Sequence, residues 1–294
     1  MQPAPIASQS VEAAIEFVDL SPHIATEVRG LDLRQLLDAG TVAHLRAVWL
    51  DRAVLVFRGQ RLRQEDLVRF AKYFGEIGER GKSATVYPPG IGRVLPEIML
   101  ISNIREDGKP IGALPDGEMS FHHDRIQTEV PHMASLLYSV EVPSHGGDTC
   151  FAAGHAAYDT LDPAVREKLE SRRVVNGYRY GTMKRGDKAG GYDAEDSAIH
   201  PAFRTHEETG RKAIFVNRLM SSNVEGLEEK EGEMLLNAVF DHAEKPEFVY
   251  CHKWRVGDLL MWDNRNSMHA RTDFPPDQRR LMWRTQIKGT HRPL

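Results

Sequence analysis

The 294-residue chain carries 38 basic and 42 acidic residues, a formal net charge of −4, and both signs are interspersed along its length. This distribution argues against the concentrated basic patch that nucleic-acid binding needs, and no run of about 18 apolar residues is present that could span a bilayer. With 41% apolar residues the chain can build one large core, so we expect a single domain over residues 1–294.

The first part of the sequence indicates strands and amphipathic helices in alternation. Residues 1–13 are rich in Pro, Ala, Ser and Gln and predict a loose arm. In chain order we then expect a strand at residues 15–20, a helix at 41–50, a buried strand at 53–57 and a helix at 63–74. Residues 77–121 are dense in Gly and Pro and predict long loops around one strand at 97–102. Loops of this kind often frame a functional site.

Short strand-like segments dominate the second half. Strands are expected at residues 134–140, 149–152, 213–216, 247–251, 259–262 and 281–287, and helices at residues 163–171 and 225–243. Residues 176–197, rich in Gly, Lys and Asp, predict a mobile loop that could act as a lid. We find no internal repeat and no linker, so the pattern predicts an all-β core of two sheets with helices packed outside.

One short segment places an imidazole and a carboxylate where both can reach one metal ion. His122 and Asp124 are two residues apart, and in an extended strand such positions point to the same side, whereas His123 points to the other. The triplet alone is more typical of a solvated surface loop. His269, which follows the segment WDNRNSM at residues 262–268, supplies a third candidate ligand. Two histidines and one carboxylate are the ligand set of many non-haem iron(II) oxygenases.

Two arginines near the end of the chain predict a pocket for a dicarboxylate. Arg280 and Arg284 are four residues apart, and an even spacing on a strand places both side chains on one face. A guanidinium group binds a carboxylate through two parallel hydrogen bonds. Two such groups in one pocket would therefore attract a doubly charged ligand.

The cysteine content and the first residues suggest a location in the cytoplasm. The only two cysteines, Cys150 and Cys251, form no C-x-x-C pair and are too few for a disulfide framework, so we expect both to be reduced and structural. The first residues also lack the basic start and apolar stretch of a secretory signal.

Together these motifs make the chain resemble the taurine dioxygenase (TauD/TfdA) family of iron(II)- and 2-oxoglutarate-dependent dioxygenases. The resemblance extends over most of the chain. Besides the motifs above it includes Gly59-Gln60, Phe74-Gly75-Glu76, PSHGGDT at residues 143–149, and the stretch from His200-Pro201 through TGRK at 209–212 to Val216-Asn217. It implies a mainly β fold with flanking helices around a double-stranded β-helix core, the jelly-roll or cupin-like arrangement. It also implies iron(II), 2-oxoglutarate and dioxygen as reactants.

The resemblance further implies roles for individual residues. The implied iron ligands are His122, Asp124 and His269. Thr149 and Arg280 correspond to the pair that binds the distal carboxylate of 2-oxoglutarate, and Arg284 lies beside the cosubstrate and meets an acidic group of the substrate. Arg80, Lys82 and Tyr87 occupy the substrate-side loop without a clear alignment, and of these Tyr87 is the candidate substrate contact. The implied reaction is hydroxylation of a small anionic organic molecule, followed in some cases by C–O, C–N or C–S cleavage, with release of succinate and carbon dioxide.

Two other functions remain open at this point. A zinc hydrolase could use the same two histidines and carboxylate, but it would require a general base and would leave the paired arginines without a role. A non-catalytic, ligand-binding relative would be favoured by a broken ligand triad, and here all three candidate ligands are present. The expected partner is a small molecule rather than nucleic acid or a membrane, and we expect a homo-oligomer, either a dimer or a tetramer.

Overall fold

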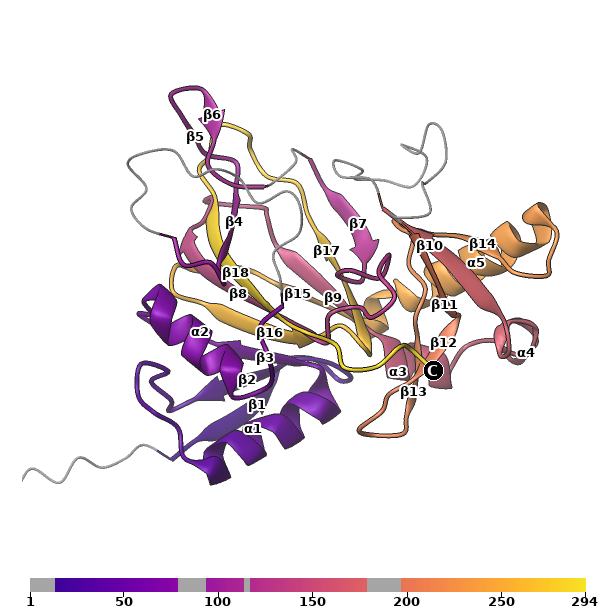
Figure 1. Ribbon diagram of the computed structural model, residues 1–294, viewed down its shortest axis with the longest axis horizontal. Helices are drawn as coiled ribbons and strands as arrows, with labels where there is room; N and C mark the ends of the chain where they lie inside the picture. The colour runs from indigo at the N-terminus through magenta and orange to yellow at the C-terminus, as the bar shows by residue number, and fades with distance from the viewer. Residues whose placement is uncertain (1–13, 79–93, 114–116, 179–196) are drawn as a thin grey trace, which may run out of the picture.

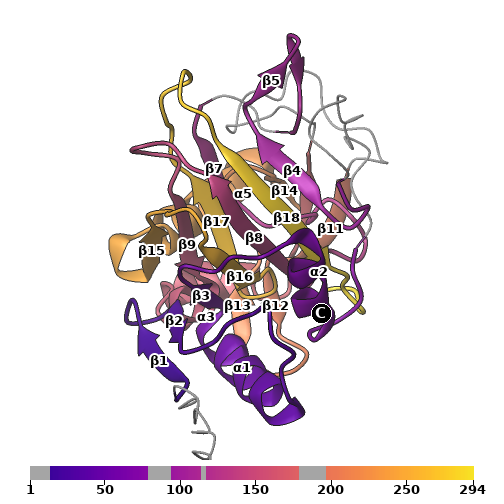
Figure 2. The same ribbon diagram turned by 90° about the vertical axis from the view of Figure 1, so that its left-hand side faces the viewer.

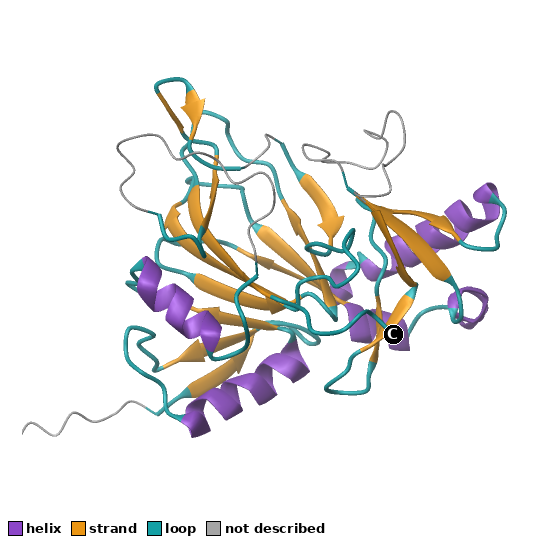
Figure 3. Ribbon diagram, viewed as in Figure 1, coloured by secondary structure: helices purple, strands orange, loops and turns teal. Residues whose placement is uncertain are grey.

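The structure is a computed structural model in which residues 14–78, 94–113, 117–178 and 197–294 are described (Figure 1). Within these ranges the chain consists mainly of strands, with helices at the periphery, as Figure 3 shows. No described helix is long and apolar enough to cross a membrane. The predicted arm at 1–13 and most of the predicted lid at 176–197 lie outside the described residues.

The largest sheet has seven strands in the order β1-β2-β3-β16-β8-β18-β4. Their bounds are β1 (Glu16–Asp19), β2 (Thr26–Arg29), β3 (Val54–Phe57), β4 (Met99–Ser102), β8 (Ala134–Glu141), β16 (Leu259–Asp263) and β18 (Leu281–Ile287). All neighbouring strands pair antiparallel except β2 and β3, which are parallel. A smaller antiparallel sheet has the order β15-β9-β17-β7. Its strands are β7 (Met119–His122), β9 (Thr149–Ala153), β15 (Val249–His252) and β17 (Ser267–Arg271).

The seven-stranded sheet is buried on both faces, and its residues alternate between two apolar clusters. In β16, Leu260 and Trp262 belong to the cluster shared with the smaller sheet, whereas Leu259 and Met261 belong to the cluster shared with two helices. These helices are α1 (Ala39–Arg52) and α2 (Gln64–Lys72), which lie along the outer side of the sheet in Figure 1. The alternation follows from the opposite orientation of successive side chains in a strand. Figure 2 shows β9 and β17 of the smaller sheet beside β8 and β18 of the larger one, and the prediction of a jelly-roll, cupin-like core is confirmed.

The remaining elements form a layer beside the smaller sheet, at the right of Figure 1. The helices there are α3 (Gly154–Asp159), α4 (Pro163–Leu169) and α5 (Glu229–Ala243), followed by a short 3-10 helix, η2 (Pro246–Phe248). The strands of this layer are β10 (Arg173–Gly177), β11 (Ser197–Pro201), β12 (Phe203–Thr205), β13 (Lys212–Ile214) and β14 (Ser221–Val224). A separate hairpin is formed by β5 (Arg105–Glu106) and β6 (Lys109–Pro110). Of these short strands, β13 overlaps the strand predicted at 213–216, and the others were not predicted from the sequence.

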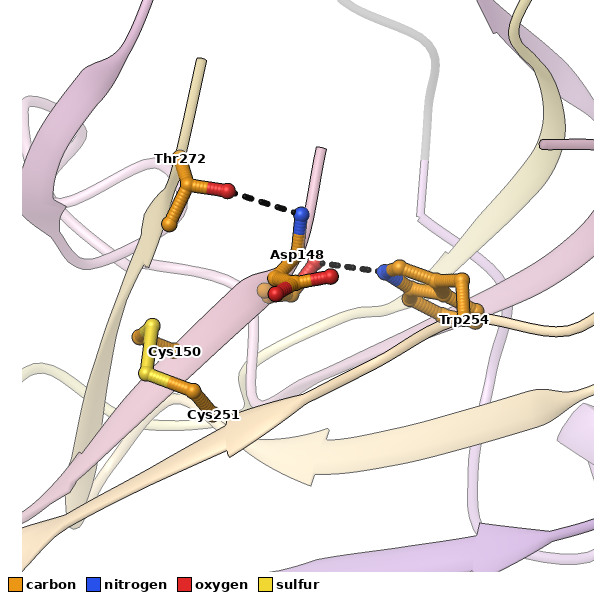
Figure 4. Close-up of a disulfide and its surroundings, with 6 residues drawn as sticks. Asp148, Cys150, Cys251, Trp254 and Thr272 are labelled. Atoms are coloured by element: carbon orange, nitrogen blue, oxygen red, sulfur yellow. Dashed lines mark hydrogen bonds between the residues drawn. A yellow bond between two sulfur atoms is a disulfide. The ribbon is translucent and has the colours of Figure 1, made fainter. Parts of the chain in front are cut away.

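The two cysteines form a disulfide, so the prediction that they are reduced is wrong (Figure 4). Cys150 in β9 and Cys251 in β15 are direct partners in an antiparallel pair, which brings their side chains to the same face at the same level. Cys150 is buried, whereas Cys251 is exposed. The two residues are 101 positions apart in the sequence, and their spacing gave no sign that the strands would pair.

Candidate active site

The three predicted metal ligands meet between the two sheets. His122 is the last residue of β7 and pairs in register with His269 of β17, while Asp124 follows two residues after His122. Each side chain offers one ligand atom, and these atoms all lie within 4.8 Å of one another. The Nε2 atom of His269 is 3.8 Å from Oδ2 of Asp124. All three side chains are buried, so the cluster can enclose an ion away from bulk water.

His123 points away from this cluster, as strand alternation predicted. Its Nδ1 atom accepts a hydrogen bond from Nδ2 of Asn217 at 3.1 Å, and its ring packs against Phe215 with 4.9 Å between centroids. The neighbouring histidine is therefore part of the packing behind β7 and is absent from the group of ligand atoms.

The protonation states of the cluster suit a metal ion. Burial lowers the pKa of His122 and lowers that of His269 well below its usual value, so both imidazoles are neutral at pH 7 and can donate a lone pair. Burial is the largest single influence on Asp124 and opposes its ionisation. The charge of Arg284, the interactions with His269 and His122 and the hydrogen bond from Ser135 together outweigh burial and hold the pKa of this carboxyl well below its usual range. A neutral histidine pair and an ionised carboxylate are the forms that bind a divalent cation.

Hydrogen bonds fix the orientation of two of the ligands. The Nδ1–H of His122 donates to the carbonyl oxygen of Ser120 at 3.0 Å, which directs Nε2 toward the cluster. The hydroxyl of Ser135 in β8 donates to Oδ2 of Asp124 at 2.6 Å. This hydroxyl in turn accepts hydrogen bonds from Nδ2 of Asn264 at 3.1 Å and from Nε2 of Gln286 at 3.0 Å. Sequence reasoning missed Ser135, which lies on the other sheet.

The segment before His269 is a buried turn that joins β16 to β17. Asp263 accepts two hydrogen bonds from the guanidinium of Arg265, at 2.8 and 2.6 Å, and one from Nε2 of His206 at 3.1 Å. The indole N–H of Trp262 donates to Oδ1 of Asn264 at 2.9 Å. These contacts fix the start of the strand that carries His269.

A cavity of about 80 Å³ opens beside the metal cluster. Its lining includes His122 and His269 and four residues with hydrogen-bonding side chains, namely Thr149, Arg271, Arg280 and Arg284. The structure thus places both predicted arginines and the predicted threonine in one cavity. Arg271 was not predicted, although it lies two residues after His269 on β17, and strand alternation could have identified it. Tyr87, together with Arg80 and Lys82, lies outside the described residues.

Arg280 has the environment of a residue that binds a carboxylate ligand. It is 1% exposed, and its Nε and Nη1 atoms have no hydrogen-bond partner among the described residues. Burial, and secondarily the charge of Arg271, lowers the pKa of Arg280 to about 9. A buried guanidinium without a counter-ion is costly, and a bound carboxylate would offset that cost. The distal carboxylate of 2-oxoglutarate fits this position, and the neutral histidine pair with Asp124 fits iron(II).

Comparison with known proteins identifies the family. Residues 16–286 match the family described as taurine catabolism dioxygenase TauD, TfdA family. The 2,4-dichlorophenoxyacetate dioxygenase of Cupriavidus pinatubonensis, which depends on alpha-ketoglutarate (2-oxoglutarate), is 35% identical over 90% of this chain and 94% of its own length. The (S)-phenoxypropionate/alpha-ketoglutarate-dioxygenase of Sphingobium herbicidovorans is 32% identical, over 94% and 96% of the two chains.

Solved structures agree with this assignment. A putative alpha-ketoglutarate-dependent taurine dioxygenase from Burkholderia xenovorans has a TM-score of 0.78 at 31% identity, covering 96% of this chain and 94% of its own. The structure of AAD-2 in complex with Mn(II) and N-oxalylglycine has the same TM-score at 29% identity, covering 96% of this chain and 100% of its own. The chain therefore belongs to the TauD, TfdA family and is a 2-oxoglutarate-dependent non-haem iron dioxygenase.

Proposed function

We propose that this dioxygenase hydroxylates a small organic anion whose acidic group binds Arg284 beside the iron. The observation that carries the proposal is the charge of the cavity. Among the described residues three arginines line it, and Asp124 is the single carboxylate at the metal cluster. Iron(II) adds two positive charges and 2-oxoglutarate two negative ones, so the loaded site keeps an excess positive charge. A buried excess of this kind favours an anionic substrate.

Each residue of the site has a defined task in this proposal. His122, Asp124 and His269 hold iron(II), which with 2-oxoglutarate and dioxygen supplies the oxidising chemistry. Thr149 and Arg280 bind the distal carboxylate of the cosubstrate. The burial of these groups between the sheets excludes water from the reacting centre.

Arg284 is placed to serve the substrate rather than to anchor the cosubstrate. Its Nη1 atom lies 3.4 Å from Oδ1 of Asp124, and its side chain keeps 22% of its surface exposed, whereas Arg280 is almost fully enclosed. An anion entering from solvent meets Arg284 first, and binding there brings the adjacent carbon close to the metal. Proximity of this kind is a large part of enzymatic rate enhancement.

Aryloxyalkanoic acids are the first substrates to test. Two relatives are named for phenoxypropionate and 2,4-dichlorophenoxyacetate, and both compounds carry a carboxylate and an ether oxygen on the same carbon. Hydroxylation of that carbon gives a hemiketal or hemiacetal, which loses the phenol and leaves a 2-oxo acid. Release of a phenol together with succinate would therefore report both hydroxylation and C–O cleavage.

The test is a screen of carboxylates, sulfonates and aryloxy acids against neutral analogues, with succinate release as the readout. We expect turnover of anions only, and Arg284→Gln should raise KM for the anion while the anaerobic absorption band of the iron and 2-oxoglutarate chelate persists. Arg279→Gln is the matched control, since Arg279 pairs at the surface with Glu141 at 2.7 Å. Equal turnover of neutral analogues, or an unchanged KM in Arg284→Gln, would refute the proposal.

The single-domain organisation, the homo-oligomeric state and the cytoplasmic location stay predictions. The disulfide bears on the last of these, because disulfides persist mainly in oxidising compartments. Alkylation of free thiols in freshly lysed cells would show whether Cys150 and Cys251 are paired in the cell.

A further inference from the structure

We infer that Trp254 is a positioning residue for 2-oxoglutarate, because it orients the hydroxyl group of Thr149. The inference rests on the proposed role of Thr149 in binding the distal carboxylate. Trp254 lies in the segment between β15 and β16, outside the cavity lining, and its indole Nε1–H donates to Oγ1 of Thr149 at 3.0 Å. Figure 4 shows Trp254 together with the neighbouring disulfide.

The direction of this hydrogen bond decides what the hydroxyl can do. An indole N–H is a donor only, so the Thr149 oxygen must accept from it. The hydroxyl proton of Thr149 cannot point back at Trp254 and is left to donate elsewhere. Because Thr149 lines the cavity, the donor is directed to where the carboxylate of the cosubstrate would lie beside Arg280. A carboxylate needs a donor at this position, and a hydroxyl turned the other way would present a lone pair to it.

The indole itself is held in place by buried groups. Its ring packs edge-on against the ring of His252, with 4.8 Å between centroids and an angle of 78°. His252 is fully buried, and its Nε2 atom is 3.0 Å from Oδ2 of Asp258. His252, against which the indole packs, is therefore held by a hydrogen bond as well as by packing.

The backbone around Thr149 is fixed on both sides. The preceding residue, Asp148, donates its N–H to Oγ1 of Thr272 at 2.9 Å. The following residue, Cys150, is joined by the disulfide to Cys251, three residues before Trp254 (Figure 4). Because the backbone is held in this way, the Thr149 hydroxyl can still rotate about its C–O bond. The hydrogen bond from the indole N–H restricts this rotation.

A double-mutant cycle separates this role from simple packing. Trp254→Phe keeps an aromatic ring and removes the N–H, and Thr149→Val keeps the side-chain shape and removes the hydroxyl. The readout is the Kd of 2-oxoglutarate in the anaerobic iron(II) protein, followed through the absorption band of the chelate. We expect Trp254→Phe to weaken binding roughly threefold to tenfold in the wild-type background and to have no further effect in Thr149→Val. KM for 2-oxoglutarate should rise more than kcat at saturating cosubstrate falls.

Trp49→Phe is the control for loss of an indole N–H. Trp49 is also buried, but its Nε1 has no hydrogen-bond partner among the described residues, so the Kd of 2-oxoglutarate should not change. Should Trp254→Phe fail to fold, site-specific replacement of Trp254 by benzothienylalanine removes the N–H and keeps the bicyclic shape, and the same result is expected.

The possible results distinguish the inference from the proposed function. If Trp254→Phe and Thr149→Val weaken binding additively, Trp254 acts by packing and the inference is wrong. If Thr149→Val weakens binding and Trp254→Phe does not, the inference is again wrong while the role of Thr149 stands. If Thr149→Val itself binds 2-oxoglutarate normally, the assignment of the cosubstrate site fails, and the inference fails with it.

Discussion

Replacing Ser135 by alanine is expected to weaken iron(II) binding without touching a ligand. The buried Ser135 hydroxyl donates to Asp124 at 2.6 Å and accepts from the buried Asn264 and the half-buried Gln286. A hydrogen bond to a charged group contributes about 1.5–3 kcal/mol, which corresponds to a loss of iron affinity of roughly tenfold to a hundredfold. The amide groups of Asn264 and Gln286 would also lose an acceptor, so the free energy of unfolding should fall by about 1–3 kcal/mol.

The assay is an anaerobic titration of metal-free protein with iron(II), together with urea unfolding of the same samples. Ser139→Ala is the matched control, because Ser139 lies on the same strand and is equally buried, but its hydroxyl donates to the carbonyl oxygen of Arg255 at 2.6 Å. The control should lose stability and keep its iron affinity. Wild-type iron affinity in folded Ser135→Ala, or an equal loss in Ser139→Ala, would refute the reasoning.

Three further predictions concern stability. Unfolding without reductant should expose no free thiol at Cys150 or Cys251, and reduction should lower the free energy of unfolding by about 2–4 kcal/mol; two reactive thiols before reduction would contradict the disulfide. Burial lowers the pKa of His200 to about 4, against about 6.5 in the unfolded chain. Between these values the unfolded chain binds the proton more readily, so the part of the free energy of unfolding that depends on neutral His200 is complete above pH 6.5 and is lost as the pH falls toward 4. Urea unfolding across this pH range should show the loss, and an equally steep loss in His200→Gln would contradict its assignment to this residue. Arg265→Leu leaves Asp263 buried with the contact to His206 but without the guanidinium charge, and this should cost about 3–5 kcal/mol in the same assay; a cost below about 1 kcal/mol would show that the pair is not needed.

The part of the site that could be predicted depends on short spacings along the chain. His122 and Asp124 are two residues apart, and Arg280 and Arg284 four, so the period of an extended chain predicted that each pair lies on one face, although Asp124 lies just after β7 and Arg280 just before β18. The same rule rejected His123, which the structure places behind the sheet against Asn217. Applied once more, it would have identified a third arginine two residues after His269.

What could not be predicted depends on which strands become neighbours. Ser135 and Asp124 lie 11 residues apart, and the first belongs to the larger sheet while the second follows a strand of the smaller one. The disulfide likewise depends on the pairing of β9 with β15, and no local pattern specifies that register. The short strands β10, β11, β12 and β14 escaped prediction for a related reason, since their conformation is set by the layer in which they pack, whereas β13 overlaps the strand predicted at 213–216.

Both sheets contribute side chains to the site, so the geometry of the site depends on how the sheets pack in the core. The smaller sheet supplies the two histidines of the candidate metal cluster and Thr149, whereas the larger one supplies Ser135 and Arg284 to hold the charge of Asp124. Neither sheet alone has both a complete ligand set and its counter-charges. The rings of Phe151, Trp262 and His269 pack together across the interface, with 5.4 Å between the first two centroids and 4.8 Å between the last two. The contacts that bury apolar surface between the sheets therefore also set the distances from Asp124 to Ser135 and Arg284, which stabilise its charge.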